Sequence, residues 1–193
     1  ATCQKPHGAE IHLPFPSVGA TENVILLAVK AEGETILHDA AREPEVGELC
    51  RFLRSAGARI RGEGTDCIVI EGKQELHDTE FTVMPDRIVA GTSMLLRAAT
   101  GGSIRLWEVP VEQLTSLWPV LGAMGVEVRT EGDRVFLSRQ RRKPCCLTVE
   151  TAPYPGFPTD LQSPLLAALA GLPGESRITE RVFEARFKIV EEL

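Results

Sequence analysis

The chain has 193 residues, of which 43% are hydrophobic and 25% are charged, a composition typical of a soluble globular protein with one or two domains. Its net charge of −6 argues against a nucleic-acid-binding protein, which would neutralise phosphates with basic side chains. No stretch of the sequence reaches the about 20 consecutive apolar residues that a membrane span requires.

The cysteines and histidines show no disulfide or metal-binding pattern. The five cysteines include no Cys-x-x-Cys pair, and none of the four histidines lies four residues from another. We therefore expect no metal, no cofactor, no signal peptide and a cytoplasmic location. The basic run at 139–143 is interpreted as a solvated loop. The neighbours Cys145 and Cys146 begin a predicted strand, and we interpret both as structural.

Taken in order, the chain predicts the same succession of elements three times: strand, helix, strand, helix, strand, strand. In the first copy we expect strands at 10–15, 35–38, 58–61 and 67–70 and helices at 24–31 and 44–56. In the second copy we expect strands at 79–84, 103–109, 126–129 and 134–137 and helices at 94–99 and 111–121. In the third we expect strands at 145–150 and 176–182 and a helix at 161–170, and residue 193 comes where a second helix is expected to be under way.

Equivalent threonines, Thr21, Thr92 and Thr159, recur about 70 residues apart, a spacing typical of repeated structural units that share one core. The first helix of each copy is apolar almost all round, which predicts that it is buried among other elements. We therefore expect helices packed together inside, with sheets and amphipathic helices outside them.

A proline-rich corner stands out in the third copy. Prolines at 153, 155 and 158 bar a helix, and Thr159 and Asp160 then begin an apolar helical run. Asp160 thus lies on a strand-to-helix corner, where backbone N–H groups and the helix dipole favour an anionic or polyhydroxy ligand. The alternative interpretation is that Asp160 satisfies backbone N–H groups at the start of the helix.

Six motifs in this order resemble the UDP-N-acetylglucosamine 1-carboxyvinyltransferase family, the UDP-GlcNAc enolpyruvyl transferases, over essentially the whole chain. They are Ser17-Val-Gly-Ala-Thr-Glu-Asn23, Ala40-Ala-Arg-Glu-Pro-Glu45, Gly64-Thr-Asp66, Met84-Pro-Asp-Arg87, Thr151 to Gln162 and Phe183-Glu-Ala-Arg-Phe187. The resemblance implies an α/β fold, the inside-out α/β barrel of enolpyruvyl transferases, built of β-α-β-α-β-β repeats. Residues 1–84 would be the last repeat of one barrel domain, and 85–193 the first one and a half repeats of the second.

The resemblance also implies a function: transfer of the enolpyruvyl group of phosphoenolpyruvate to the 3-hydroxyl of UDP-N-acetylglucosamine. This is the first committed step of peptidoglycan precursor synthesis, which serves cell-wall biogenesis, cell shape and cell division. Asp160 matches the proposed general base of the family, a role that suits a carboxylate within reach of an alcohol. The segment Phe15, Pro16, Ser17, Val18 and Gly19 matches the part that holds the UDP diphosphate, and Val182 a main-chain contact to the nucleotide sugar.

Several other positions match polar family residues in less central places. Glu43, Asp86, Arg87, Glu184 and Arg186 are supporting candidates, although Glu43 and Asp86 also suit turn or cap positions, and Arg186 suits an ion pair with Glu184 or Glu43. No cysteine of this chain matches the family's catalytic cysteine. Ala185 stands where many family members have Asn.

Two alternative functions remain open in the sequence. One is a non-catalytic fragment that binds a nucleotide sugar, because the cysteine loop is missing and the chain alone is expected to be inactive. The other is a transferase like 5-enolpyruvylshikimate-3-phosphate synthase, which the motifs fit less well. A barrel cut partway would expose apolar helices such as 161–170, so we also expect self-association.

Overall fold

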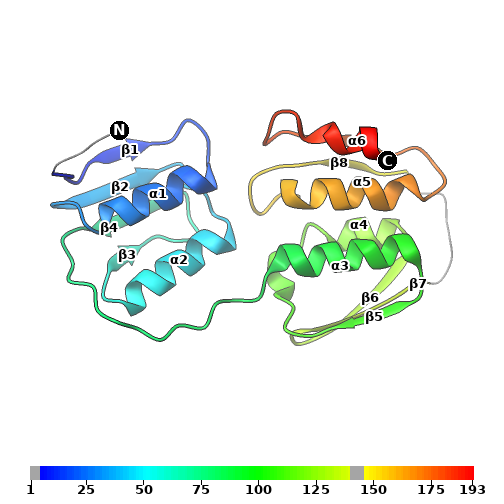
Figure 1. Ribbon diagram of the computed structural model, residues 1–193, viewed down its shortest axis with the longest axis horizontal. Coiled ribbons are helices and arrows are strands. Elements are labelled where there is room, and N and C mark those ends of the chain that lie inside the picture. The colour runs from blue at the N-terminus through cyan, green and yellow to red at the C-terminus, as the bar shows by residue number, and fades with distance from the viewer. Residues whose placement is uncertain (1–4, 140–145) are drawn as a thin grey trace. The chain divides into compact units, whose positions relative to one another are not determined.

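The computed structural model describes residues 5–139 and 146–193, and the chain forms two compact units, Ala1–Met84 and Pro85–Leu193 (Figure 1). Each unit contains a sheet covered on one face by helices, with its own apolar core. None of the helices in the described parts of the chain is long and apolar enough to cross a membrane.

The first unit has the succession strand, helix, strand, helix, strand, strand. Its elements are β1 (Glu10–His12), α1 (Val18–Ala28), β2 (Glu34–His38), α2 (Pro44–Ser55), β3 (Arg59–Arg61) and β4 (Cys67–Glu71). The strands lie in the order β1-β2-β4-β3, with β1 parallel to β2 and the other pairs antiparallel. Buried side chains of α1, α2 and the sheet form one core, so α1 and α2 cover the inner face.

The ends of these elements follow local chemistry. Ser17 caps α1, which therefore begins at Val18, six residues before the predicted start. Pro44 occupies the first turn of α2, where its missing N–H costs nothing. Gly57, with φ of 104°, ends that helix in a conformation that favours glycine. The predicted strand at 10–15 stops at His12, because Pro14 and Pro16 lack the N–H groups of a ladder.

The second unit contains two further copies of the succession, each incomplete. The first copy comprises α3 (Arg87–Thr100), β5 (Ser103–Leu106), η1 (Val111–Leu114), α4 (Trp118–Ala123), β6 (Val126–Glu131) and β7 (Arg134–Arg139). The second comprises β8 (Thr148–Glu150), η2 (Thr159–Leu161), α5 (Gln162–Ala170), β9 (Arg177–Thr179), η3 (Arg186–Lys188) and α6 (Ile189–Glu192). The antiparallel sheet has the order β5-β7-β6, and β8 pairs with β9 in parallel.

Helix α3 lies between the antiparallel sheet and α5 (Figure 1). Its close approach to the neighbouring corner depends on Gly91, because a Cβ there would lie 2.7 Å from Leu161 Cδ1. Leu161 and Leu165 are fully buried in the same core as Met94 and Leu95 of α3. The helix that precedes each second strand is therefore the packing centre of its copy.

Three predictions about these elements are wrong. Residues 79–84 form no strand, and the predicted helix at 111–121 is divided into η1 and α4, with Pro119 in the first turn of α4. The first helices are not buried all round, because Leu26, Leu27, Val89 and Leu96 are all more than half exposed. Conversely, the helix expected to expose its apolar face, α5, buries Leu165 and Leu169. The basic run at 140–143 and Cys145 lie outside the described residues.

Candidate functional site

The corner between β8 and α5 presents Asp160 to solvent. Pro158 has extended backbone angles, φ −69° and ψ 133°, and one turn of 3-10 helix, η2, follows before α5 begins. The helix start positions are held by Pro158 and Leu161, and neither makes a side-chain cap. Leu161 anchors the turn in the core, whereas the Asp160 side chain is 56% exposed. The turn thus holds a carboxylate outward on a fixed base.

Arg186 holds that carboxylate from a distant part of the chain. Its Nη1 donates to Asp160 Oδ1 at 2.9 Å and to the Thr159 carbonyl oxygen at 3.1 Å. Its guanidinium also lies 4.7 Å from the centre of the Phe183 ring. The pairing of Arg186 with Glu184 or Glu43 was therefore a wrong prediction: its partner is Asp160, and Glu184 is exposed. Ala185, with φ of 56°, makes the left-handed bend that precedes Arg186.

Glu180, which the sequence analysis missed, ties both sides of the corner together. Its carboxylate accepts hydrogen bonds of 2.8 Å from the hydroxyls of Thr151 and Thr159. It also accepts from the backbone N–H groups of Val182, at 2.8 Å, and Phe183, at 3.1 Å. One side chain after β9 therefore fixes the end of β8, the first residue of η2 and the segment that leads to Arg186.

The ionised form of Glu180 is the one this network stabilises. Burial by itself raises the pKa of this carboxyl, but the four hydrogen-bond donors outweigh it, so the pKa lies below its ordinary value. The charge of Glu180 is consequently present throughout the neutral range. Its acceptor atoms are engaged inside the corner, which leaves Asp160 as the outward carboxylate.

Val182 lies in this segment and is half-buried. Because its backbone N–H donates to Glu180, a main-chain contact with a ligand falls to its carbonyl oxygen. The structure thus gives a specific atom for the predicted contact of Val182.

The predicted diphosphate segment, in the first unit, forms the start of α1. Ser17 Oγ accepts a hydrogen bond from Ala20 N at 3.3 Å, so this hydroxyl acts as the helix cap. The capping interpretation of Ser17 is therefore confirmed. The first-turn N–H groups of Val18 and Gly19 lie before the first intrahelical bond, where a helix can receive an anion.

The surface above this turn is open. Gly19 is exposed, and a Cβ added there would meet nothing within 4 Å. The Phe15 side chain is 40% exposed, whereas Pro16 is half-buried and its residue partner Ser17 turns the chain through a hydrogen bond from Ser17 N to Phe15 O. A ligand can therefore approach the backbone of Val18 and Gly19 closely.

The remaining candidates have structural positions. Asp86 caps α3 by accepting from the N–H groups of Ile88, at 2.6 Å, and Val89, at 3.0 Å. Arg87 is buried, and its guanidinium lies 5.5 Å from the centre of the Tyr154 ring. Glu43 takes the cap position of α2 but makes no side-chain cap. The prediction that Asp86 is a cap residue is confirmed.

The described cysteines do not form a reactive centre. Cys50 is fully buried, and burial raises the pKa of its thiol to about 11, so it stays protonated at neutral pH. Cys67 is half-buried on β4, and Cys146 is exposed. The interpretation of Cys146 as structural stays a prediction, and Cys3 and Cys145 lie outside the described residues.

The fold is that of the enolpyruvyl transferases. The enolpyruvyl transferase NikO from Streptomyces tendae superposes on 100% of this chain with a TM-score of 0.85 at 26% sequence identity, and 48% of the NikO chain is covered. EPSP synthase from Acinetobacter baumannii matches 90% of the chain with a TM-score of 0.63 at 22% identity, and this match concerns the fold alone.

The sequence comparisons give the family. The family model "EPSP synthase (3-phosphoshikimate 1-carboxyvinyltransferase)" matches residues 2–193, and the chain belongs to this family. It is 47% identical over 186 residues to UDP-N-acetylglucosamine 1-carboxyvinyltransferase 2 of Caldanaerobacter subterraneus subsp. tengcongensis. It is also 47% identical over 194 residues to the protein of that name from Carboxydothermus hydrogenoformans.

These matches cover 96% and 100% of this chain but 45% and 46% of the two relatives. The chain thus spans about half the length of the curated relatives that it matches.

Proposed function

We propose that the chain is part of an enolpyruvyl transferase that acts on phosphoenolpyruvate and UDP-N-acetylglucosamine in the cytoplasm. The observation that carries this proposal is the 44–47% identity to relatives named UDP-N-acetylglucosamine 1-carboxyvinyltransferase, over 96–100% of the chain. The reaction would supply a precursor for peptidoglycan synthesis.

The chemistry assigns a proton transfer to Asp160. The 3-hydroxyl oxygen of the sugar forms a bond to C2 of phosphoenolpyruvate, and a proton enters at C3. The C2–O bond to phosphate then breaks, the C3 proton leaves, and the double bond is restored as phosphate departs. The hydroxyl must lose its proton as it attacks, and the outward carboxylate of Asp160 is the acceptor that we assign.

Arg186 would act as a positioning residue for this base. It bonds both the carboxylate of Asp160 and the backbone of the same turn, so the carboxylate has one preferred direction. Charge-assisted hydrogen bonds of this kind fix geometry as well as adding free energy. The Glu180 network supports the turn beneath, and the Val182 carbonyl is the main-chain atom that we assign to the nucleotide sugar.

The start of α1 would bind the diphosphate of the UDP group. The support for this is the open surface above Gly19 and the orientation of first-turn N–H groups at a helix start. The Ser17 hydroxyl is engaged as the cap, so the backbone of Val18 and Gly19 would supply the contacts.

The test is release of phosphate by the complete protein. Supplied with phosphoenolpyruvate and UDP-N-acetylglucosamine, it should release one phosphate for each enolpyruvyl ether formed, as followed by phosphate assay and mass spectrometry. Shikimate 3-phosphate in place of the nucleotide sugar is the matched control, and little phosphate is expected. Turnover confined to shikimate 3-phosphate would overturn the proposal and support the second candidate.

That second candidate is EPSP synthase activity, which the name of the matching family model favours. The names of the relatives at 44–47% identity favour the UDP-N-acetylglucosamine reaction instead. A non-catalytic nucleotide-sugar-binding role would give saturable UDP-N-acetylglucosamine binding with no phosphate release from either acceptor.

A further inference from the structure

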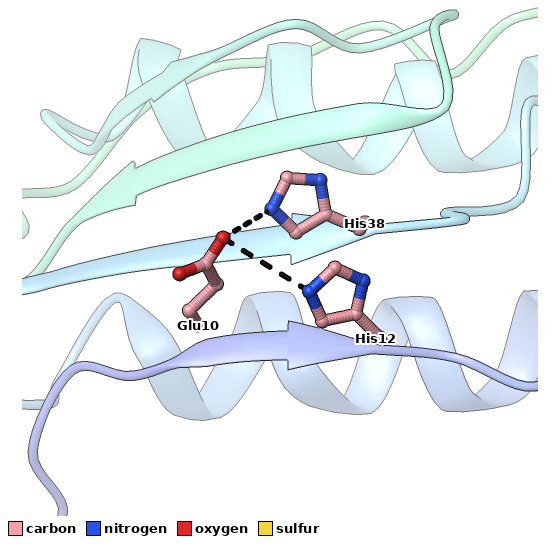
Figure 2. A group of neighbouring side chains, drawn as sticks. All are labelled: Glu10, His12 and His38. Atoms are coloured by element: carbon pink, nitrogen blue, oxygen red, sulfur yellow. Dashed lines mark hydrogen bonds and ion pairs between the residues drawn. The ribbon is translucent and has the colours of Figure 1, made fainter.

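The strand register of the first unit brings together two histidines and a glutamate on the outer face of its sheet. His12 of β1 is the direct partner of His38 of β2, and Glu10 lies two residues before His12. Side chains on a strand alternate between faces, and Leu37 is fully buried among the helices, so Glu10, His12 and His38 share the opposite face. Figure 2 shows the two rings side by side with the Glu10 carboxylate beside them.

The donor atoms of these three side chains converge. Glu10 Oε1 lies 2.9 Å from His38 Nε2 and 4.0 Å from His12 Nε2 (Figure 2). The imidazole rings are stacked, with centroids 4.3 Å apart and planes 9° from parallel. One ligand atom from each residue lies within 4.8 Å of the others. Two metal–ligand bonds of about 2.0–2.2 Å span about 4 Å, so small rotations of these accessible side chains complete a coordination site.

A carboxylate also faces the second nitrogen of His12. Asp39 follows β2 directly, and its Oδ2 lies 4.0 Å from His12 Nδ1. A carboxylate on this side favours the tautomer with the proton on Nδ1, which leaves Nε2 as the electron-pair donor toward Glu10. Metal-binding histidines are commonly oriented by a carboxylate in this way.

We propose that Glu10, His12 and His38 bind a divalent transition-metal ion of the zinc class. Two imidazole nitrogens and one carboxylate oxygen are the ligand types that zinc takes from proteins, and they also suit nickel and copper. The ion replaces the proton that otherwise links His38 to Glu10. This site is independent of the proposed enolpyruvyl transfer, because none of its three residues is assigned a part in that reaction.

Binding at this site cross-links two strands. β1 is an edge strand of three residues, held to the sheet by β2 alone, and the ion joins both strands through side chains. An ion that binds the folded state and not the unfolded one raises the unfolding temperature in proportion to its saturation. β1 also leads into the turn that Ser17 caps, so the cross-link stabilises the chain just before α1.

The test is calorimetric titration of the complete protein with Zn²⁺ at about pH 7.5, where imidazole is neutral. We expect a single site, and at least about a 100-fold loss of affinity in His12→Gln and in His38→Gln, because even residues that only support metal ligands contribute 10- to 100-fold. The matched control is His77→Gln, since His77 is an exposed histidine whose Nδ1 instead contacts the Asp78 carbonyl oxygen. This control should bind as the wild type does.

A thiolate is the main competitor as a ligand, because Cys67 of β4 is the direct strand partner of His38 on its other side. Cys67→Ser should therefore retain the site, and the Co²⁺-loaded protein should lack the charge-transfer absorption of a thiolate ligand. Unfolding temperatures without metal should be equal in the wild type and the histidine variants. Zinc affinity that is unchanged in His12→Gln and His38→Gln, or lost equally in His77→Gln, would overturn the proposal.

Discussion

Arg186 Nη1 donates to Asp160 Oδ1 at 2.9 Å, across 26 residues of sequence. The same nitrogen donates to the carbonyl oxygen of Thr159, so one guanidinium holds both the carboxylate and the backbone of the turn that carries it. A carboxylate held in this way has its direction set by the fold before any ligand arrives. Four predictions concern this corner, the start of α1 and the packing beneath them.

Replacing Asp160 tests the assigned base. Asp160→Asn keeps the shape of the side chain and removes its capacity to accept the hydroxyl proton, so we expect kcat to fall about 10²- to 10⁴-fold. The Kd for UDP-N-acetylglucosamine should change little. Steady-state kinetics and calorimetry on the complete enzyme measure both quantities.

Arg186→Gln is the comparison variant for that experiment. It leaves the base in place but removes its positioning contact, so a smaller loss in kcat is expected, on the order of 10- to 100-fold. Near-normal kcat in Asp160→Asn would remove this residue from the mechanism.

Gly19→Ala separates helix stability from ligand binding. The added methyl meets nothing within 4 Å, and alanine is the better helix residue, so stability should rise by about 0.5 kcal/mol. The same methyl covers the first-turn backbone, so UDP-N-acetylglucosamine affinity should fall by about tenfold, or about 1.4 kcal/mol.

The matched control for this experiment is Gly47→Ala in α2, where a Cβ also meets nothing within 4 Å. It should stabilise the protein without changing affinity, as measured by thermal unfolding and calorimetry. Unchanged affinity in Gly19→Ala would argue against a diphosphate at this turn.

Glu180→Gln tests the network that supports the corner. At neutral pH it replaces a charged acceptor of four hydrogen bonds, and we expect a loss of about 2 kcal/mol in unfolding free energy. The two tryptophans, Trp107 and Trp118, both lie in the second unit, so urea unfolding of this chain followed by tryptophan fluorescence reports on that unit.

The effect of Glu180 should depend on pH with a definite sign. Because the folded pKa is lowered, the stabilisation by the charged form is present above the ordinary glutamate pKa of about 4.3 and is lost as the pH falls through the lower folded value. The difference between wild type and Glu180→Gln should therefore shrink in acid. The exposed residue Glu175 provides the control, and a similar loss in Glu175→Gln would contradict a specific network.

Gly91→Ala tests the contact beneath the corner. Its Cβ would lie 2.7 Å from Leu161 Cδ1, in a core where Leu161 is fully buried, so overpacking should cost about 1–3 kcal/mol. The displaced Leu161 is next to Asp160, and kcat should fall with stability. Gly122→Ala in α4 meets nothing within 4 Å and should be neutral or stabilising; equal losses in both variants would show that the close approach does not matter.

The elements that punctuation residues delimit could be predicted from the sequence. Pro44 and Gly57 mark α2, Gly171 ends α5, and the turn at 131–134 joins β6 to β7. The start of α1 could not be placed from apolar residues alone, because the Ser17 cap adds a turn whose residues are mostly polar or small. Residues 79–84 alternate like a strand, but a strand also requires a partner, which a local pattern does not specify.

The candidate site was predictable only in part. Asp160 follows from the proline-rich corner together with the resemblance of the motifs. Its partner Arg186 and the network of Glu180 depend on how the segment after β9 folds back, and the bend at Ala185 has no sequence signal, since alanine rarely adopts φ of 56°. The His12–His38 pair depends on strand register, which the spacing of histidines along the chain does not reveal.

The helix starts of the three copies show how duplication can divide tasks among equivalent positions. Ser17 and Asp86 both spend their side-chain oxygens on the N–H groups of their own helices. In the third copy Pro158 and a 3-10 turn begin the helix without a side-chain cap, and Arg186 takes up the nearby carboxylate. Release from the structural duty that its counterparts retain is what makes Asp160 available for chemistry, so an ancestral corner would gain a catalytic group by losing a cap.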